Sequence, residues 1–278
     1  MLHLAAIFLS IVFLFCSTPF VEIETLENDK NIIYRDTATV YDYDNGGIMT
    51  YDVTSEVIYY TSRSITKSHA LAIQYPRYSY SPAVGACGAV AGGNIIGFYD
   101  RYDENLIPNH VSGTPYLNTY IYSIEDSAVH AVIDQLYYYM GTDHVGTTEQ
   151  EFIDGLTKFC KEKGKGVSLS SCMKNGTFSY STAQSYLESN QPIILFLSGY
   201  NVGTLFESEN KDTMSYYYSN ANHIMIGFGY RIYAYTTSSG SFNYELISVA
   251  SGISGNSSGM FNINFQTTIN DALAINIY

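Results

Sequence analysis

The segment at residues 84–102, VGACGAVAGGNIIGFYDRY, has the apolar spacing of a helix but contains unusually many glycines. Each glycine in a helix interior costs about 1 kcal/mol relative to alanine. Small residues allow the rest of the fold to approach a helix closely, so we expect this helix to be tightly enclosed. The glycines concerned are Gly88, Gly92, Gly93 and Gly97.

A cysteine stands where this segment turns from loop into helix. The start of a helix offers unpaired backbone N–H groups and about half a positive charge. Both favour the thiolate of Cys87, and the same N–H groups can stabilise an oxyanion. Two interpretations remain open from these residues: Cys87 is a nucleophile, or the helix is tightly packed and inert.

A thiol nucleophile needs a base, and His223 has a suitable context. It begins an apolar strand after a polar loop, in the stretch NANHIMIGFGYR. Such a placement holds an imidazole at the edge of a cleft while the strand anchors it. The other histidines lie in the first residues, in polar loops or inside a predicted helix.

The remainder of the chain predicts an α+β fold. Helices are expected over 125–141, 148–164 and 181–191, the second beginning with a capping box of Thr148 and Glu151. After Pro192 the sequence is strand-like and is divided by Gly, Ser and Asn turns. We therefore expect one domain over 75–278, with segregated layers. Residues 19–74 are either a short pro-segment or extra strands.

Residues 1–18 form a short apolar run that is typical of a signal peptide, with an uncleaved N-terminal anchor as the alternative. We therefore expect a secreted or cell-surface protein with no stable membrane insertion after removal of this segment. Removal would leave three cysteines, an odd number that suggests a free thiol. Cys160 and Cys172 either form a disulfide, leaving Cys87 unpaired, or all three are reduced.

The formal net charge of −13, with no basic cluster to offset it, argues against a nucleic-acid partner. No metal-ligand spacing such as HExxH or paired CxxC occurs, so we expect no metal and no cofactor. The oligomeric state does not follow from the sequence.

The stretches GACGAVAGGNIIGFYDRYDENLIP, QPIILFLSG and NHIMIGFGY resemble papain-like cysteine peptidases. The resemblance is to the bacteriocin-leader-processing and streptopain-type branches, and it covers roughly residues 75–262. It implies a helical first half packed on an antiparallel sheet. It also implies that Cys87 is the nucleophile and His223 the general base and acid.

Two positions depart from that pattern. The Asn or Asp that orients the histidine in these families falls on Val249 or Ala250. Neither side chain accepts a hydrogen bond, so Ser248, Ser251 or a backbone carbonyl replaces it, or the pair works as a dyad. In these families a glutamine several residues before the cysteine forms part of the oxyanion hole. This sequence has no glutamine at that spacing, and Gln74, farther upstream, is the candidate.

The sequence thus predicts a secreted bacterial-type cysteine peptidase that hydrolyses peptide bonds in a protein or peptide substrate. One alternative is a catalytically inactive relative that serves as a binding protein. A second is a thiol amidase or acyltransferase that acts on cell-wall peptides.

Overall fold

The computed structural model describes residues 32–42, 47–72, 74–122, 127–143, 145–253, 257–265 and 267–278. The predicted signal peptide, residues 1–18, lies outside the described residues. Within them, no helix is both long enough and apolar enough to cross a membrane.

All four predicted helices are present. They are α1 (Cys87–Asp100), α2 (Ser127–Tyr139), α3 (Glu149–Glu162) and α4 (Tyr180–Glu188). The capping box at the start of α3 is confirmed, because the Thr148 side chain accepts from the Glu151 amide and the Glu151 carboxylate accepts from the Thr148 amide. Cys87 is the first residue of α1, as the sequence predicts.

The described strands form one large antiparallel sheet and two small hairpins, so the α+β class is confirmed. The order of the large sheet is β1-β2-β10-β11-β12-β9-β13-β6, and β3 also pairs with β10. The hairpins are β4-β5 and β7-β8. The strands are β1 (Ile32–Asp42), β2 (Gly47–Tyr59), β3 (Ser62–Ala70), β4 (Gly113–Tyr116), β5 (Thr119–Tyr122), β6 (Val167–Ser171), β7 (Met173–Lys174), β8 (Thr177–Phe178), β9 (Ile193–Ser208), β10 (Lys211–Thr237), β11 (Gly240–Ala250), β12 (Ser258–Asn262) and β13 (Thr268–Ile277).

The segment that precedes residue 75 contributes strands to this sheet. Both β2 and β3 pair with β10 along most of their lengths. The sheet therefore begins before the helices, and of the two alternatives left open by the sequence for residues 19–74, the described part of that segment forms extra strands. These strands need β10, which follows more than 140 residues later, to satisfy their backbone hydrogen bonds, so local sequence cannot show where they belong.

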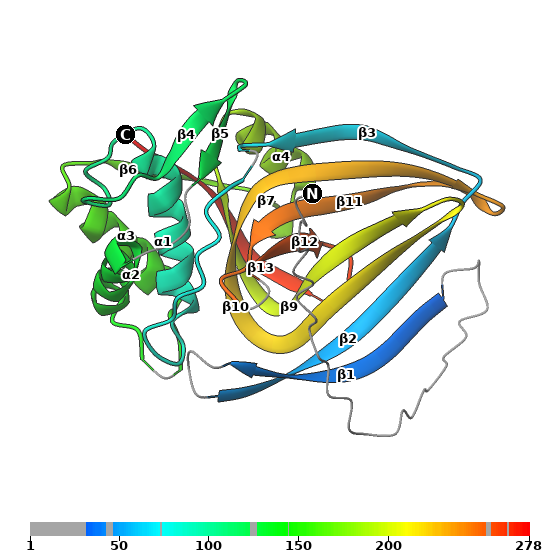
Figure 1. Cartoon of the computed structure of the whole chain (residues 1–278), viewed down its shortest axis with the longest axis horizontal. Helices are drawn as coiled ribbons and strands as arrows, with labels where there is room; N and C mark the ends of the chain where they lie inside the picture. Colours follow the sequence, from blue (N-terminus) through cyan, green and yellow to red (C-terminus); the bar gives the residue numbers. More distant parts are fainter. Residues whose placement is uncertain are drawn as a thin grey trace, which may run out of the picture.

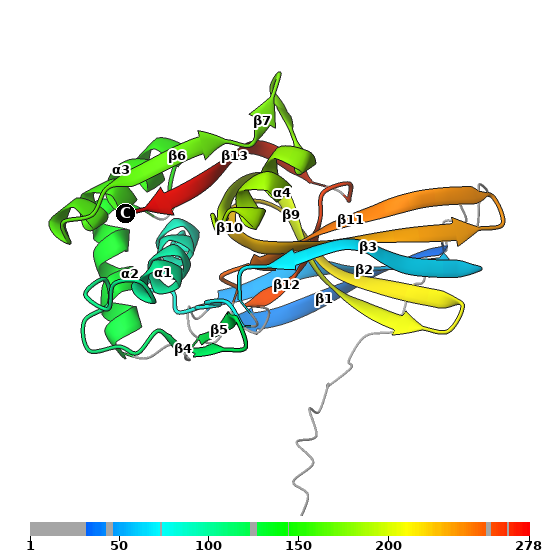
Figure 2. The ribbon, with the colours of Figure 1, turned by 90° about the horizontal axis from the view of Figure 1, so that it is seen from above.

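Helix α1 lies between α2 and the sheet, with β10 on its sheet side (Figures 1 and 2). Every residue of α1 after Cys87 is buried. A Cβ on Gly93 would lie 2.6 Å from Cγ1 of Ile133, and one on Gly97 would lie 2.5 Å from the Tyr78 ring. The glycines therefore make room for neighbouring side chains, which confirms the expected close enclosure of this helix.

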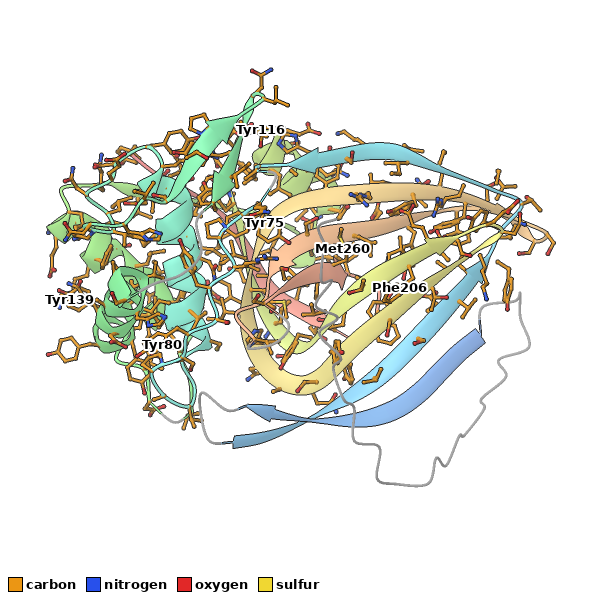
Figure 3. All side chains as sticks on the ribbon, viewed as in Figure 1. Tyr75, Tyr80, Tyr116, Tyr139, Phe206 and Met260 are labelled. Atoms are coloured by element: carbon orange, nitrogen blue, oxygen red, sulfur yellow. The ribbon has the colours of Figure 1, made fainter. Side chains whose placement is uncertain are left out.

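The sheet extends away from the helices as an arm, formed by residues 54–70, 202–218 and 230–246 (Figure 1). Side chains fill the space between its strands, with Met260 near the inner end and Phe206 farther out (Figure 3). The arm has its own hydrophobic cluster, separate from the main core around α1. Its buried members are Ile58, Met214, Tyr216, Tyr233, Tyr235, Tyr244 and Leu246.

Candidate active site

Cys87 is half-buried at the start of α1, and amide groups point toward its sulfur. Burial raises the pKa of the Cys87 thiol, while hydrogen bonds from the amides of Ile224, Gly88 and Cys87 itself lower it in part. The net direction is upward. This direction is opposite to the one expected from the helix N-terminus alone, because desolvation affects the thiol pKa more than the nearby amides do.

His223 lies in the interior of β10 and not at the start of a strand, because the polar stretch before it also pairs with β9. It comes directly after a register shift between Ser219 and Asn222. The imidazole Nε2 lies 2.7 Å from the main-chain oxygen of Ser251. The ring also lies against Tyr200, with 4.5 Å between the ring centroids and 32° between the planes. Burial lowers the pKa of His223 to about 4, and the Ser251 carbonyl offsets this only in part. Above that pH the imidazole is neutral.

The group that orients His223 is therefore a main-chain carbonyl. Val249 and Ala250 are buried and pair with Gly227 and Ile226 in the β10–β11 ladder. The Ser248 hydroxyl is directed at the sulfur of Met260, 3.5 Å away, rather than at the imidazole. The sequence left open Ser248, Ser251 or a backbone carbonyl as the group that orients His223, and in the structure the backbone carbonyl of Ser251 contacts the imidazole.

Cys87 and His223 line the same cavity, which has a volume of about 490 Å³. Its lining includes three apolar residues from the strands β9 and β10, namely Phe196, Leu197 and Ile224. The Ile224 amide that reaches the Cys87 sulfur belongs to the residue directly after His223. The cavity thus brings together a thiol, an imidazole and backbone amides from segments 136 positions apart in the numbering.

One wall of the cavity is the loop between α2 and α3, together with the start of α3. This loop packs closely on the approach to Cys87. A Cβ on Gly85 would lie 2.4 Å from the Asp143 carbonyl oxygen, and one on Gly88 would lie 2.8 Å from the Thr147 side chain. The Thr142 and Thr147 hydroxyls are 2.7 Å apart and join the two ends of the loop.

The same wall is acidic. Asp143, Glu149 and Glu151 line the cavity, and no Lys or Arg stands among its lining residues. No ion pair to these three carboxylates is found in the described part of the chain. Burial, followed by the neighbouring carboxyl of Asp271, raises the pKa of Glu149. The cavity therefore presents negative charge on one side of the Cys87–His223 pair.

Gln74 is not brought to this cavity. Gln74 is exposed and forms a parallel bridge with Ile121 of β5. Its main-chain carbonyl accepts a hydrogen bond from the Tyr122 amide. Sequence reasoning missed Asn222 and Asn270, which do line the cavity. Asn222 stands directly before His223, and its Oδ1 accepts from the Ser198 hydroxyl at 3.1 Å. The position of Asn222 beside His223 is the one feature of the sequence that could have identified Asn222 as a cavity residue.

The two other described cysteines are free and buried. Burial raises the pKa of Cys160 and of Cys172 to about 12. They form no disulfide with each other, and neither lines the cavity. Of the described cysteines, only Cys87 reaches the cavity.

No grouping of three or more His, Cys, Asp or Glu side chains suited to a metal ion occurs in the part of the chain that the structure describes.

No protein-family model matches the sequence, and no curated protein matches it. Among solved structures, this chain is similar to the peptidase domain of Streptococcus ComA, a bi-functional ABC transporter involved in a quorum-sensing pathway. The sequence identity is 12%, and the match covers 75% of this chain and 96% of that one, with a TM-score of 0.30. An identity and a TM-score this low do not establish a common family.

Proposed function

We propose that the protein is a papain-like cysteine peptidase in which Cys87 is the nucleophile and His223 the general base and acid. The observation that carries this proposal is the shared cavity: a thiol at a helix start, an imidazole with one nitrogen already bonded, and amides directed at the sulfur. A nucleophile, a base and an orienting group in this order are the parts that acyl transfer through sulfur requires.

In the first half of the reaction, Nδ1 of His223 accepts the Cys87 thiol proton as the sulfur attacks the peptide carbonyl carbon. A C–S bond forms, and the carbonyl oxygen takes up the negative charge. The C–N bond then breaks as the imidazolium returns its proton to the leaving amine. In the second half, water attacks the thioester with His223 as base, and the acid and the thiol are released.

The amides of Cys87 and Gly88, which point toward the sulfur, are the candidate donors for the oxyanion. Backbone donors of this kind stabilise charge as it develops without reorganisation. Asn222 lines the same cavity, and its side-chain amide is a further candidate donor. Together these groups occupy the role that the sequence assigned to Gln74.

The protonation states define how the pair starts. With a raised thiol pKa and a lowered imidazole pKa, the pair starts as a neutral thiol and a neutral imidazole near neutral pH. Proton transfer then accompanies attack and does not precede it. We infer that His223 acts as a true general base rather than as the partner of a preformed thiolate.

We also propose that the protein acts outside the cytoplasm. The apolar run at residues 1–18 is the support for export, since it has the length of a signal-peptide core. Mass spectrometry of the mature N-terminus tests this, and an intact N-terminus in the exported fraction would indicate an anchor instead.

The same fold without catalysis is the second candidate function. The specific observation in its favour is the raised pKa of Cys87, because a neutral thiol is a poor nucleophile. A binding protein would retain the cavity and its acidic wall and would leave the thiol unused.

A peptide-library digest with the full chain separates the two candidates. The wild-type protein is expected to cleave peptides, and iodoacetamide is expected to stop cleavage by alkylating Cys87 alone. Cys87→Ala should abolish cleavage, whereas Cys172→Ala, at a buried thiol outside the cavity, should retain it. Cleavage that survives in Cys87→Ala would refute the proposal, and peptide binding without cleavage by the wild-type protein would support the second candidate.

A further inference from the structure

We propose that the turn at Ser251–Gly252 is the positioning device of this site, with Gly252 a residue that the site requires although it touches no substrate. The proposal rests on the proposed function, since it explains how His223 is held for the reaction. In this chain a main-chain carbonyl takes the place of an orienting side chain.

The carbonyl determines which imidazole nitrogen carries the proton. A carbonyl oxygen only accepts hydrogen bonds, so Nε2 of His223, 2.7 Å from the Ser251 oxygen, has to be the protonated nitrogen. The neutral ring then has its lone pair on Nδ1. That is the nitrogen left to accept the thiol proton, and the opposite tautomer would make His223 useless as a base.

The turn that carries this carbonyl is held on several sides. Ser251 is buried, and its amide donates to the Ser257 carbonyl at 3.0 Å. Its hydroxyl accepts from the Ile253 amide at 3.1 Å. Both polar groups of Ser251 other than the carbonyl are therefore bonded within the turn, and the carbonyl is directed at His223.

Gly252 gives the turn its shape. Its φ is +69°, in the region that residues with a side chain rarely adopt. A Cβ at this position would also lie 3.0 Å from Cγ1 of Val90. Val90 belongs to α1, three residues after Cys87, so the turn packs on the helix that carries the nucleophile. One glycine thus sets the position of the Ser251 carbonyl relative to both Cys87 and His223.

Tyr200 completes the arrangement. The Tyr200 ring is buried and lies against the imidazole. It therefore limits rotation of the His223 side chain, in addition to the hydrogen bond with the Ser251 carbonyl. The ring is held by Tyr200 on one face and by the Ser251 carbonyl at Nε2, while Cys87 lines the cavity that the ring also faces.

The test is ¹⁵N NMR of the histidine side chains in the full chain at neutral pH, with the His223 signals assigned by comparison with His223→Asn. The wild-type protein is expected to show the Nε2–H tautomer. An Nδ1–H tautomer for His223 would overturn the proposal, whatever the activity of the protein.

The matched variants are Gly252→Ala and Gly176→Ala. Gly176 has a similar φ, +75°, in the β7–β8 turn, with nothing within 4 Å of an added Cβ. We expect Gly252→Ala to show a mixture of tautomers and to lose kcat by about 100-fold, since small misplacements of reacting groups cost this much. KM should stay within about threefold, because substrate binding is not touched.

Gly176→Ala is expected to keep both the tautomer and kcat. Equal losses in the two variants would overturn the proposal. If Gly252→Ala does not fold, the wild-type tautomer alone decides. A wild-type protein with the Nε2–H tautomer but no peptidase activity would refute the proposed function and leave the positioning of His223 standing.

Discussion

The arm and the cavity use carboxylates in opposite ways. In the arm the carboxylates of Asp212 and Glu56 face the interior and are bonded to side chains of other strands. Those of the cavity wall have no ion pair in the described residues, and Asp143 and Glu151 accept only from groups of their own loop. Acids that bond to other strands hold the fold together, and acids that line a cavity without a cationic partner can attract a cationic ligand. The difference separates the parts of this chain that maintain structure from those that meet substrate.

Asp212 shows the structural use. It is fully buried, both its oxygens lie 2.8 Å from Nη1 of Arg63, and it accepts from the Tyr235 hydroxyl at 2.6 Å. The Ser208 amide donates to it as well, at 3.2 Å. Three donor groups, which make four hydrogen bonds, thus compensate the desolvation of one carboxylate, and the Arg63 contact ties β3 to β10.

Glu56 is held by neutral groups. It accepts from the Tyr244 hydroxyl at 2.7 Å and from the Tyr216 hydroxyl at 3.4 Å, and Asn262 bonds to both tyrosines. Burial raises the pKa of Glu56 despite these hydrogen bonds. The arm therefore fills its narrow interior with tyrosines whose rings pack and whose hydroxyls satisfy buried acids.

The largest effect on stability is expected from breaking the arm at Asp212. Asp212→Ala leaves Arg63 without its buried partner and should lower the free energy of unfolding by about 4 kcal/mol, as for other broken buried pairs. Urea unfolding measures this. Glu207→Gln removes the exposed partner of Arg63 and should cost less than about 1 kcal/mol. Peptidase activity of folded Asp212→Ala should equal that of the wild type, and a loss of kcat would contradict the division between arm and cavity.

The second prediction concerns pH and the cavity. His223 has a pKa of about 4 when folded and an ordinary pKa near 6.5 when unfolded, so the unfolded chain binds the proton more readily. The stability contribution is present above pH 6.5 and is lost as pH falls toward 4. Relative to His223→Gln, the wild type should lose about 3 kcal/mol over this window. Unfolding curves of equal pH dependence in the two proteins would show that His223 is not desolvated.

The third prediction tests how closely neighbouring side chains pack against α1. Gly93→Ala brings a Cβ to 2.6 Å from Cγ1 of Ile133 and should destabilise the protein by about 2 kcal/mol. Gly92→Ala is the matched control, because its nearest atoms are the ends of Leu136 and Met140 at 3.1 Å, which can shift. Thermal unfolding of both variants checks the difference. A Gly93→Ala protein as stable as Gly92→Ala would mean that α1 is less closely enclosed than the contacts indicate.

The smallest expected effect is a charge preference at the cavity wall. Peptides with Lys or Arg near the cleaved bond should be hydrolysed about tenfold more efficiently than matched peptides with Glu, since each contact with the acidic wall contributes about 1 kcal/mol. High salt should reduce the preference. Glu149→Gln should weaken it, while Glu207→Gln in the arm should not. If both variants keep the same charge preference, Glu149 on the cavity wall does not select the substrate.

Local patterns in the sequence were enough for the helices and for the two candidate residues. The helical spacing after Cys87, the capping box at Thr148 and the apolar strand after His223 are each set by neighbours along the chain. The α+β class followed from the same patterns. The placement of β2 and β3 did not, because their partner β10 is far away in sequence.

The sequence by itself determined that a cysteine opens a glycine-rich helix and that one histidine directly precedes an apolar run, although this run lies inside β10 and not at its start. Only the tertiary structure decided that they share a cavity, that burial keeps both neutral, and that the Ser251 carbonyl takes the orienting role. The physical reason is range. Helix starts and strand spacing depend on nearby residues, whereas desolvation and a hydrogen bond between residues 28 positions apart depend on how the sheet and α1 close around them.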